Sequence, residues 1–433
     1  MSGISRRDFV KLLGASSAMS ALGLTGCETV PKTAAKAAPR VVVIGGGFGG
    51  ATCAKYLRVY DPTLNVTMIE QNASFTTCPG SNWVLGGLRK MEDLTQNYDA
   101  LRSKHGVKVV TDRVTAIDPA KRIVTLASGK SVEYDRLVMS PGIDFRWNEI
   151  EGYDEAASQL MPHAWKAGPQ TVLLQKQLQA MPDGGTVIMN PPPMPFRCPP
   201  GPPERASMIA HYLKANKPKS KILILDSKES FSKKDLFMDA WNNLYPGMIE
   251  WVPASKGGKV VRVDPKSLTV HTDDGSSHKA DVVNIIPAQR AGVIAIASGL
   301  SNDSGWCPVN QHTFESTLVP NVHVIGDSAV AGALPKSGHA ANNVAKMTAA
   351  AIVSLFRGTK MPTPSHVNTC YSLVGPEYGI SIAAVYRLGE DGMLAGVKGA
   401  GGLSPKEASS LHRAQEAGYA QGWYDSITAD SFG

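Results

Sequence analysis

Runs of apolar residues without polar alternation mark several buried strands along the chain. Residues 40–44 read Arg-Val-Val-Val-Ile, and residues 65–69 read Asn-Val-Thr-Met-Ile. Runs rich in β-branched residues are typical of strands in a parallel sheet that helices cover on both faces. Residues 51–57, which lie between these two runs, have the composition of a helix. The pattern therefore predicts a β–α–β unit near the start of the globular part of the chain.

The turn between the first strand and the helix has the glycine spacing of a dinucleotide-binding loop. Gly45 would permit the tight turn, Gly47 would let the backbone approach a pyrophosphate, and Gly50 would let the helix pack on the strand. The second strand ends in Glu70, about 20 residues beyond the glycines and within reach of an adenosine ribose hydroxyl. Strand, glycines, helix and terminal acid together predict a bound dinucleotide.

Two later segments fit the same unit. Residues 134–142 form a strand that leads into a tight turn, and residues 322–327 form a strand that ends in Gly-Asp, with a helix expected at 342–356. An acid at the carboxyl end of a strand lies where open α/β sheets bind ligands. These segments resemble the FAD-binding half of flavoproteins with two dinucleotide-binding domains. The resemblance implies that Asp327 holds the flavin ribityl chain.

A second unit with strands and helices interrupts the first. Strands are expected at 185–189 and 221–225, and the loop that follows the first of them is rich in proline: eight of the thirteen residues 191–203 are prolines. Proline has no N–H group to offer a phosphate, and it stiffens the chain. We therefore expect a second Rossmann-like domain that has kept its fold and lost nicotinamide nucleotide binding.

Composition and charge argue against several classes of protein. The chain has 433 residues, of which 43% are hydrophobic and 19% charged, and its net charge is +7. The first 38 residues hold five basic and two acidic residues, so the remainder is only weakly basic. That balance, without a basic stripe, does not predict nucleic-acid binding. Six cysteines are too few for a disulfide scaffold in a chain of this size, and we expect no metal site.

The N-terminus has the features of an export signal. Arg6 and Arg7 precede a weakly apolar stretch that ends near Leu24 and is too short to span a bilayer. Paired arginines in this setting predict twin-arginine export to the periplasm. Residues 24–27 also have the pattern of a lipoprotein box, so cleavage would leave either a lipid anchor on Cys27 or, near residues 37–38, a soluble protein. No other segment is expected to cross a membrane.

Five longer motifs carry a resemblance to a known family. They lie at residues 76–82, 196–202, 305–309, 335–338 and 368–372. These motifs are unusual and occur in the family's order, and after the signal segment the whole chain resembles the flavoprotein subunits of flavocytochrome c sulfide dehydrogenases. The resemblance implies an α/β fold with two Rossmann-like domains, the second without a nucleotide loop, and a C-terminal α+β domain.

The resemblance also implies roles for particular residues. A thioether would join Cys78 to the flavin 8-methyl carbon, so that FAD is covalent. Cys198 and Cys370 would form a redox disulfide beside the flavin, and Glu204 would act as an acid or base. We expect Arg197 and the rigid prolines to favour a stable, well-placed Cys198 thiolate. A purely structural disulfide is the alternative.

The sequence motifs assign no single role to three further residues, and the domain boundaries are expected from the order of the elements. Cys53 and Cys307 have no assigned role, and Trp423 lies either near the flavin or in the core. The boundaries are 1–38 for the signal segment, 39–154 and 285–360 for the two parts of the FAD-binding domain, 155–284 for the second Rossmann-like domain, and 361–433 for the C-terminal domain.

The function that these features predict is FAD-dependent oxidation of sulfide to sulfur or polysulfide, with electrons passed to a c-type cytochrome. The chain has no Cys-x-x-Cys-His sequence, so the haem would sit on a partner chain. One alternative is a sulfide:quinone reductase, and another is an accessory flavoprotein of a sulfur-oxidising carrier complex. An NAD(P)H-dependent disulfide reductase is disfavoured by the proline-rich loop.

Overall fold

The computed structural model describes residues 37–433. The paired arginines and Cys27, on which the predictions of export and lipidation depend, lie outside the described residues. Residues 38–433 form one compact unit. Within the described chain, no helix combines the length and the apolar character that crossing a bilayer requires.

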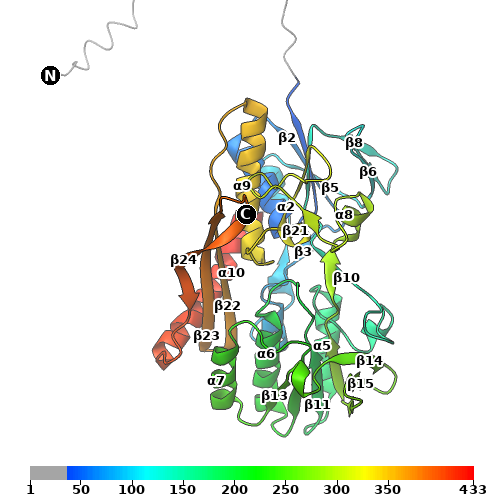
Figure 1. The fold of residues 1–433 in the computed structure, drawn as a ribbon, viewed down its shortest axis with the longest axis vertical. Coiled ribbons are helices and arrows are strands. Elements are labelled where there is room, and N and C mark those ends of the chain that lie inside the picture. Colours follow the sequence, from blue (N-terminus) through cyan, green and yellow to red (C-terminus); the bar gives the residue numbers. More distant parts are fainter. Residues whose placement is uncertain (1–36) are drawn as a thin grey trace, which may run out of the picture. The chain divides into compact units, whose positions relative to one another are not determined.

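The first sheet contains the predicted dinucleotide-binding unit. Its five strands are parallel and lie in the order β20–β9–β1–β2–β5. Their bounds are Val322–Val324, Arg136–Met139, Arg40–Ile44, Asn65–Glu70 and Lys108–Thr111. Helices α2 (Phe48–Tyr60) and α9 (Gly338–Arg357) pack against each other beside this sheet (Figure 1). Apolar side chains of β1 and β9 are fully buried, which explains why the run at 40–44 is uninterrupted.

The second sheet is also parallel, with four strands in the order β13–β12–β11–β17. Their bounds are Ile249–Val252, Lys221–Leu225, Thr186–Asn190 and Val282–Ile285. Helices α5 (Pro169–Ala180), α6 (Gly201–Asn216) and α7 (Lys234–Leu244) belong to this part of the chain, which is drawn mostly in green in Figure 1. The proline-rich loop joins the end of β11 to the start of α6, where a parallel sheet binds its ligand.

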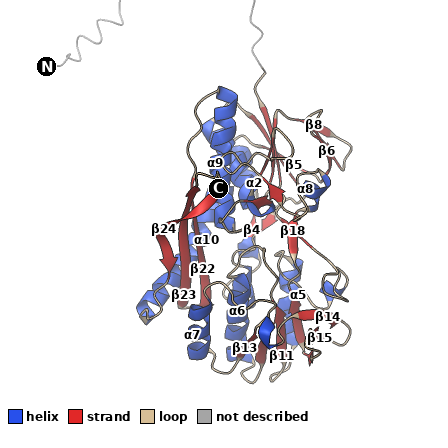
Figure 2. Ribbon diagram, viewed as in Figure 1, coloured by secondary structure: helices blue, strands red, loops and turns tan. Residues whose placement is uncertain are grey.

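The C-terminal region is an antiparallel sheet with one long helix. Strands β22 (Ser365–Gly375), β23 (Tyr378–Leu388) and β24 (Leu394–Leu403) pair in sequence, and helix α10 (Ser410–Phe432) packs on β23 (Figure 2). The end of α10 returns to the first sheet, where the Phe432 ring lies 5.6 Å from that of Phe48. This helix therefore ties the C-terminal sheet to the dinucleotide-binding unit.

Short elements connect these three parts. They are β3 (Phe75–Thr76), α3 (Ser81–Leu85), η1 (Glu92–Leu94), β4 (Thr95–Gln96), α4 (Asp99–Ser103), β6 (Val114–Asp118), β7 (Ile123–Leu126), β8 (Ser131–Glu133), β10 (Ile143–Phe145), η2 (Ala157–Gln159), η3 (Ala254–Lys256), β14 (Val260–Asp264), β15 (Thr269–Thr272), β16 (Ser277–Lys279), β18 (Gln289–Ala291), α8 (Val293–Ala297), β19 (Cys307–Pro308), η4 (Gly326–Ser328) and β21 (Ala329–Val330). Strands β10 and β18 pair where the chain passes between the two parallel sheets.

The predicted fold class is confirmed, since the chain has two parallel sheets flanked by helices and a C-terminal α+β part. The helix expected at 342–356 begins earlier, at Gly338. Ser337 explains the difference, because its side chain accepts a hydrogen bond from the Ala340 N–H and caps the first turn. The domain boundaries given above stay predictions.

Candidate functional site

The glycine turn after β1 is shaped as its spacing predicts. Gly45 has a φ of +98°, and a side chain there would lie 2.3 Å from the Ser140 carbonyl oxygen. A side chain at Gly50 would lie 1.8 Å from the Gly45 carbonyl oxygen. Gly47 precedes helix α2 and supplies no side-chain cap. The first backbone N–H groups of α2 can therefore meet an anionic ligand such as a pyrophosphate.

Glu70 stands beside this turn at the end of β2. Its Oε2 accepts a hydrogen bond from the Gly46 N–H at 2.8 Å, and its Oε1 accepts one from the Asn72 N–H at 3.0 Å. A carboxylate has about four acceptor positions, so it can still accept from a ribose hydroxyl. The same residue thus holds the turn and faces the place where a dinucleotide would bind.

Asp327 has the features of a ligand-binding acid. It lies in η4, directly after β20, and its Oδ1 is buried with no hydrogen-bond partner among the described residues. Its Oδ2 lies 3.7 Å from an Arg197 guanidinium nitrogen. Burial raises the pKa of Asp327, although Arg197 opposes this. An orphaned buried acceptor of this kind fits a ligand hydroxyl, as a flavin ribityl chain would supply.

One cavity brings most of the remaining candidate residues together. It is an open cavity of about 760 Å³ bordered by helix α3, the proline-rich loop with helix α6, the start of helix α9 and strand β22. Its lining includes four residues singled out from the sequence: Cys78, Cys198, Glu204 and Cys370. Cys78 lies in the loop before α3, Cys198 and Glu204 lie in the proline-rich loop and the start of α6, and Cys370 lies on β22. The fold brings these three distant segments together. Trp423 also lines this cavity, whereas Cys53 and Cys307 are fully buried elsewhere.

The described cysteines are free thiols in the structure, so the Cys198–Cys370 pairing stays a prediction. Cys198 has a left-handed backbone, with a φ of 57°, and its N–H donates to the Lys336 carbonyl at 2.8 Å. Cys370 lies on β22, where its Sγ accepts a weak hydrogen bond from the Asn368 side-chain amide at 3.5 Å. Both sulfur atoms thus have fixed surroundings within the same cavity.

Arg197 acts on the Cys198 thiol in the expected direction, but burial outweighs it. Burial raises the pKa of the Cys198 thiol, and the neighbouring Cys370 and Glu204 raise it further, whereas Arg197 lowers it by less. The Arg197 guanidinium also has other partners: it donates to the Trp165 carbonyl and pairs with Asp327.

Glu204 lies in the first turn of α6 and is 8% exposed. Its carboxylate accepts three hydrogen bonds, from the Asn82 amide at 2.9 Å, from the Trp83 indole at 3.0 Å and from the Leu373 N–H at 3.0 Å. Burial raises the pKa of Glu204, and the hydrogen bonds oppose this. A buried carboxyl with a raised pKa is a candidate for a general acid or base.

The cavity also contains functional candidates that sequence reasoning missed. Arg205 is 2% exposed, donates to the Asn82 and Asn284 side chains and lies over the Trp165 ring at 5.0 Å. Burial lowers its pKa to about 9. The Trp165 indole N–H is buried without a partner among the described residues. The sequence offered no signal for these two residues beyond the adjacency of Arg205 to Glu204.

His339 is a further missed residue, in the first turn of α9. Its Nδ1 lies 2.8 Å from the Thr369 backbone N–H, which donates to it. The imidazole proton is therefore held on Nε2, and burial lowers the pKa of His339, so the ring is neutral. Its ring lies 6.3 Å from that of Trp423, on the cavity wall.

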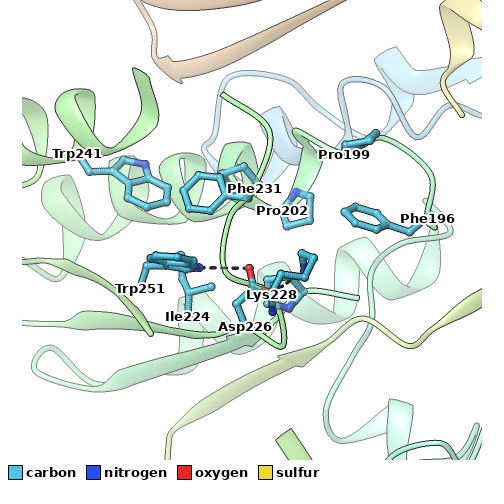
Figure 3. A pocket seen from close by; sticks show the side chains of 11 residues that line it. Phe196, Pro199, Pro202, Ile224, Asp226, Lys228, Phe231, Trp241 and Trp251 are labelled. Atoms are coloured by element: carbon cyan, nitrogen blue, oxygen red, sulfur yellow. Dashed lines mark hydrogen bonds and ion pairs between the residues drawn. The ribbon is translucent and has the colours of Figure 1, made fainter. Parts of the chain in front are cut away.

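Figure 3 shows the pocket beside the proline-rich loop, at the end of the second sheet where a Rossmann domain has its nucleotide loop. The space beside the prolines, about 270 Å³, is lined by Phe196, Phe231, Trp241 and Trp251 together with prolines. Asp226, the acid at the end of β12, accepts hydrogen bonds from the Trp251 indole at 3.2 Å and from the Lys228 ammonium. Lys228 also donates to the Pro192 carbonyl at 2.8 Å.

The acid at the end of β12 is thus already hydrogen-bonded by the protein's own groups. An acid in the place of Asp226 meets the adenosine ribose in a Rossmann domain, but here indole and ammonium groups already satisfy it. This geometry agrees with the expected loss of nicotinamide nucleotide binding. Among the described residues, no group of three or more acidic, histidine or cysteine side chains is arranged to hold a metal ion.

Three protein families match successive parts of the chain. The pyridine nucleotide-disulphide oxidoreductases match residues 39–169, the central part of the sulfide dehydrogenase [flavocytochrome c] flavoprotein chain matches residues 171–287, and the flavin-binding part of flavocytochrome c sulphide dehydrogenase matches residues 362–432. A sulfide dehydrogenase [flavocytochrome c] flavoprotein chain of Chlorobaculum thiosulfatiphilum is 62% identical over 45 residues, which are 94% of that sequence and 10% of this chain.

Other relatives are similar over longer stretches. The sulfide-quinone reductase of Aquifex aeolicus is 31% identical over 180 residues, 40% of this chain and 39% of the relative. The mitochondrial sulfide:quinone oxidoreductase of Mus musculus is 25% identical over 295 residues, 66% of this chain and 65% of the relative. The chain thus spans less than two thirds of either relative. The crystal structure of the Aquifex aeolicus sulfide:quinone oxidoreductase superposes with a TM-score of 0.71 at 20% identity, covering 91% of this chain and 92% of that one, which shows a shared fold.

Proposed function

The chain belongs to the family of flavocytochrome c sulfide dehydrogenase flavoprotein chains, within the pyridine nucleotide-disulfide oxidoreductase superfamily, and on this premise we propose that it oxidises sulfide and passes the electrons to a c-type cytochrome. The single observation that carries the proposal is the cavity in which Cys198, Cys370 and Glu204 meet Cys78. A thiol pair, a proton carrier and a flavin attachment point form a set of groups suited to sulfide oxidation with a flavin. The product is sulfur or polysulfide.

FAD is the cofactor of this family, and the described residues fit it. The glycine turn with the start of α2 would hold the pyrophosphate, Glu70 the ribose, and the orphaned Asp327 oxygen the ribityl chain. Cys78 would hold the isoalloxazine end through a thioether. When bound, FAD accepts an electron pair and releases electrons one at a time, as a haem acceptor needs.

The thiol pair would receive the substrate. Hydrosulfide attacks the Cys198–Cys370 disulfide, so one sulfur–sulfur bond forms, one breaks, and the electron pair of the broken bond stays on the sulfur that leaves. The products of this step are a persulfide on one cysteine and a thiolate on the other. Glu204, with its raised pKa, takes the proton of the entering sulfide or of the persulfide.

Substitution of the two cysteines tests this function. Cys198→Ser and Cys370→Ser should each leave a folded, flavin-loaded protein whose sulfide turnover falls by about two to four orders of magnitude, as expected when a nucleophilic pair is broken. Cys307→Ala, at a buried cysteine outside the cavity, is the matched control and should keep its turnover. A lower melting temperature with nearly intact turnover in both serine variants would identify a structural disulfide instead.

A quinone acceptor is the second candidate, because relatives named as sulfide:quinone enzymes are similar over longer stretches of the chain. Sulfide-dependent reduction of a soluble quinone, compared with reduction of a c-type cytochrome, separates the two. An accessory flavoprotein would show no sulfide turnover alone. We place the activity in the periplasm, reached by twin-arginine export; amino-terminal sequencing and lipid analysis would distinguish a soluble form from one anchored at Cys27.

A further inference from the structure

Lys233 is a buried lysine next to the cavity that contains Cys198 and Cys370. The proposed function gives this lysine no role. It directly precedes helix α7, has a left-handed backbone with a φ of 61°, and is 5% exposed. Its ammonium donates to the Cys370 carbonyl at 3.2 Å, to the Ser372 hydroxyl at 2.8 Å and to the Ile380 carbonyl at 3.2 Å. All three N–H groups are therefore used on strands β22 and β23, and the ammonium is held in one place.

The three acceptors of Lys233 are neutral, so none of them balances its charge. Leaving an ammonium buried without an opposite charge is costly. Four ionisable groups on the surrounding elements interact electrostatically with it: Cys370 on β22, Cys198 in the proline-rich loop, Glu204 on α6 and Glu416 on α10. Burial lowers the pKa of Lys233 to about 8, and these four groups oppose the shift, with Cys370 first among them.

The two carboxylates already have other partners. Glu204 accepts hydrogen bonds from Asn82, Trp83 and the Leu373 N–H, and Glu416 pairs with the Arg413 guanidinium at 3.4 Å. The sulfur of Cys370, in contrast, has among residues 37–433 only the weak hydrogen bond from Asn368. Of the four groups, Cys370 is therefore the one whose sulfur, when negatively charged, would best balance the positive charge of Lys233.

We propose that Lys233 is the buried counter-charge of Cys370, which stabilises the anionic sulfur that this residue carries as a thiolate in the reduced pair or as a persulfide after hydrosulfide has entered. This proposal rests on the proposed function for its place in turnover. Burial raises the pKa of the Cys370 thiol, and the Lys233 charge opposes this. Formation of the thiolate releases one proton, and the new negative charge in turn favours the protonated form of Lys233. Lys233 is thus a positioning residue, since it acts on the reaction through Cys370.

The test follows alkylation of reduced, flavin-loaded protein by iodoacetamide across pH, with the Cys370 peptide quantified by mass spectrometry. Lys233→Met and Lys233→Gln remove the charge, and the pH midpoint for Cys370 should rise by about one to two units, the effect of one nearby charge at intermediate screening. Ser372→Ala is the matched control, because it removes one hydrogen bond of the ammonium and leaves the charge; its midpoint should match that of the wild type. An unchanged midpoint in a folded Lys233 variant would overturn the proposal.

A measurement on the unsubstituted chain covers the case in which both Lys233 variants fail to fold. In the reduced wild type, Cys370 should be alkylated at a lower pH than Cys198, because Lys233 acts most strongly on Cys370. The reverse order would refute the counter-charge. Neither experiment uses sulfide or an electron acceptor, so a shifted midpoint in a chain that fails to oxidise sulfide would retain the inference and reject the proposed function.

Discussion

Replacing Glu204 by glutamine separates a catalytic role from a structural one. The carboxylate has one oxygen facing the Trp83 indole and the Leu373 N–H and another facing the Asn82 amide. The glutamine oxygen can keep the first two donors, but its NH2 group then faces the Asn82 NH2 group. Asn82 cannot simply turn over, because its oxygen accepts from Arg205 at 3.1 Å. One buried hydrogen bond is therefore lost, which costs about 1–3 kcal/mol of unfolding free energy.

The effect on turnover should exceed the effect on stability. Loss of a general acid or base lowers the rate by about 10²–10⁴-fold. Sulfide-dependent reduction of the acceptor measures turnover, and thermal denaturation measures stability. Glu416→Gln is the matched control, because Glu416 is also a buried carboxylate but does not line the cavity; it should lower the melting temperature and keep turnover. Turnover of Glu204→Gln within a few-fold of the control would refute the acid–base role.

The same substitution has a pH signature. Burial raises the pKa of Glu204 above its ordinary value of 4.5, so the folded state binds this proton more tightly than the unfolded state. The resulting stability is fully present below pH 4.5 and is lost as the pH rises through the folded-state pKa. Glutamine has no such proton. The destabilisation by Glu204→Gln should therefore be larger at pH 4 than at pH 8, and an increase toward pH 8 would contradict the raised pKa.

Three further predictions follow from the cofactor sites. Denatured wild-type protein should keep its flavin fluorescence on a gel, and Cys78→Ala should release FAD on denaturation; free FAD from the wild type would reject the thioether. Asp327→Ala should weaken flavin retention in the Cys78→Ala background by about tenfold or more, the effect of one lost charged hydrogen bond, measured by FAD release on dilution. Micromolar NADH or NADPH should leave the flavin oxidised, because Lys228 and Trp251 already satisfy Asp226; rapid bleaching would mean that the second domain still binds a nucleotide.

Local signals were enough to predict four of the five strands of the first parallel sheet and two of the four strands of the second. The β-branched run at 40–44 and the glycine turn at 45–50 have direct structural causes, since the strand is buried on both faces and side chains at Gly45 and Gly50 would collide with backbone. The C-terminal sheet was harder to predict in detail. Strand β24 is rich in glycine and largely exposed, so it lacks the alternation that marks a half-buried strand.

Only those site residues that lie in sequence motifs could be predicted from the sequence. Cys78, Cys198 and Cys370 lie in rare motifs, but their meeting in one cavity depends on tertiary packing. Lys233 lies in a polar run that resembles a solvated loop, and its burial comes from contacts with β22 and β23, far away in sequence. Arg197 lowers the pKa of Cys198 as expected, but the burial that outweighs it has no local sequence signal. The contacts of Arg197 with Asp327 and the Trp165 carbonyl likewise depend on the fold.

Rapid mixing of the flavin-loaded protein with sulfide, followed by an acceptor, tests the central claim most directly. Sulfide should bleach the flavin in the wild type and fail to do so in Cys198→Ser. A c-type cytochrome should then reoxidise the bleached flavin and turn over, whereas a soluble quinone should react slowly. Reoxidation by quinone with no reaction of the cytochrome would contradict the proposed acceptor, and a flavin that sulfide cannot bleach would contradict the proposed function itself.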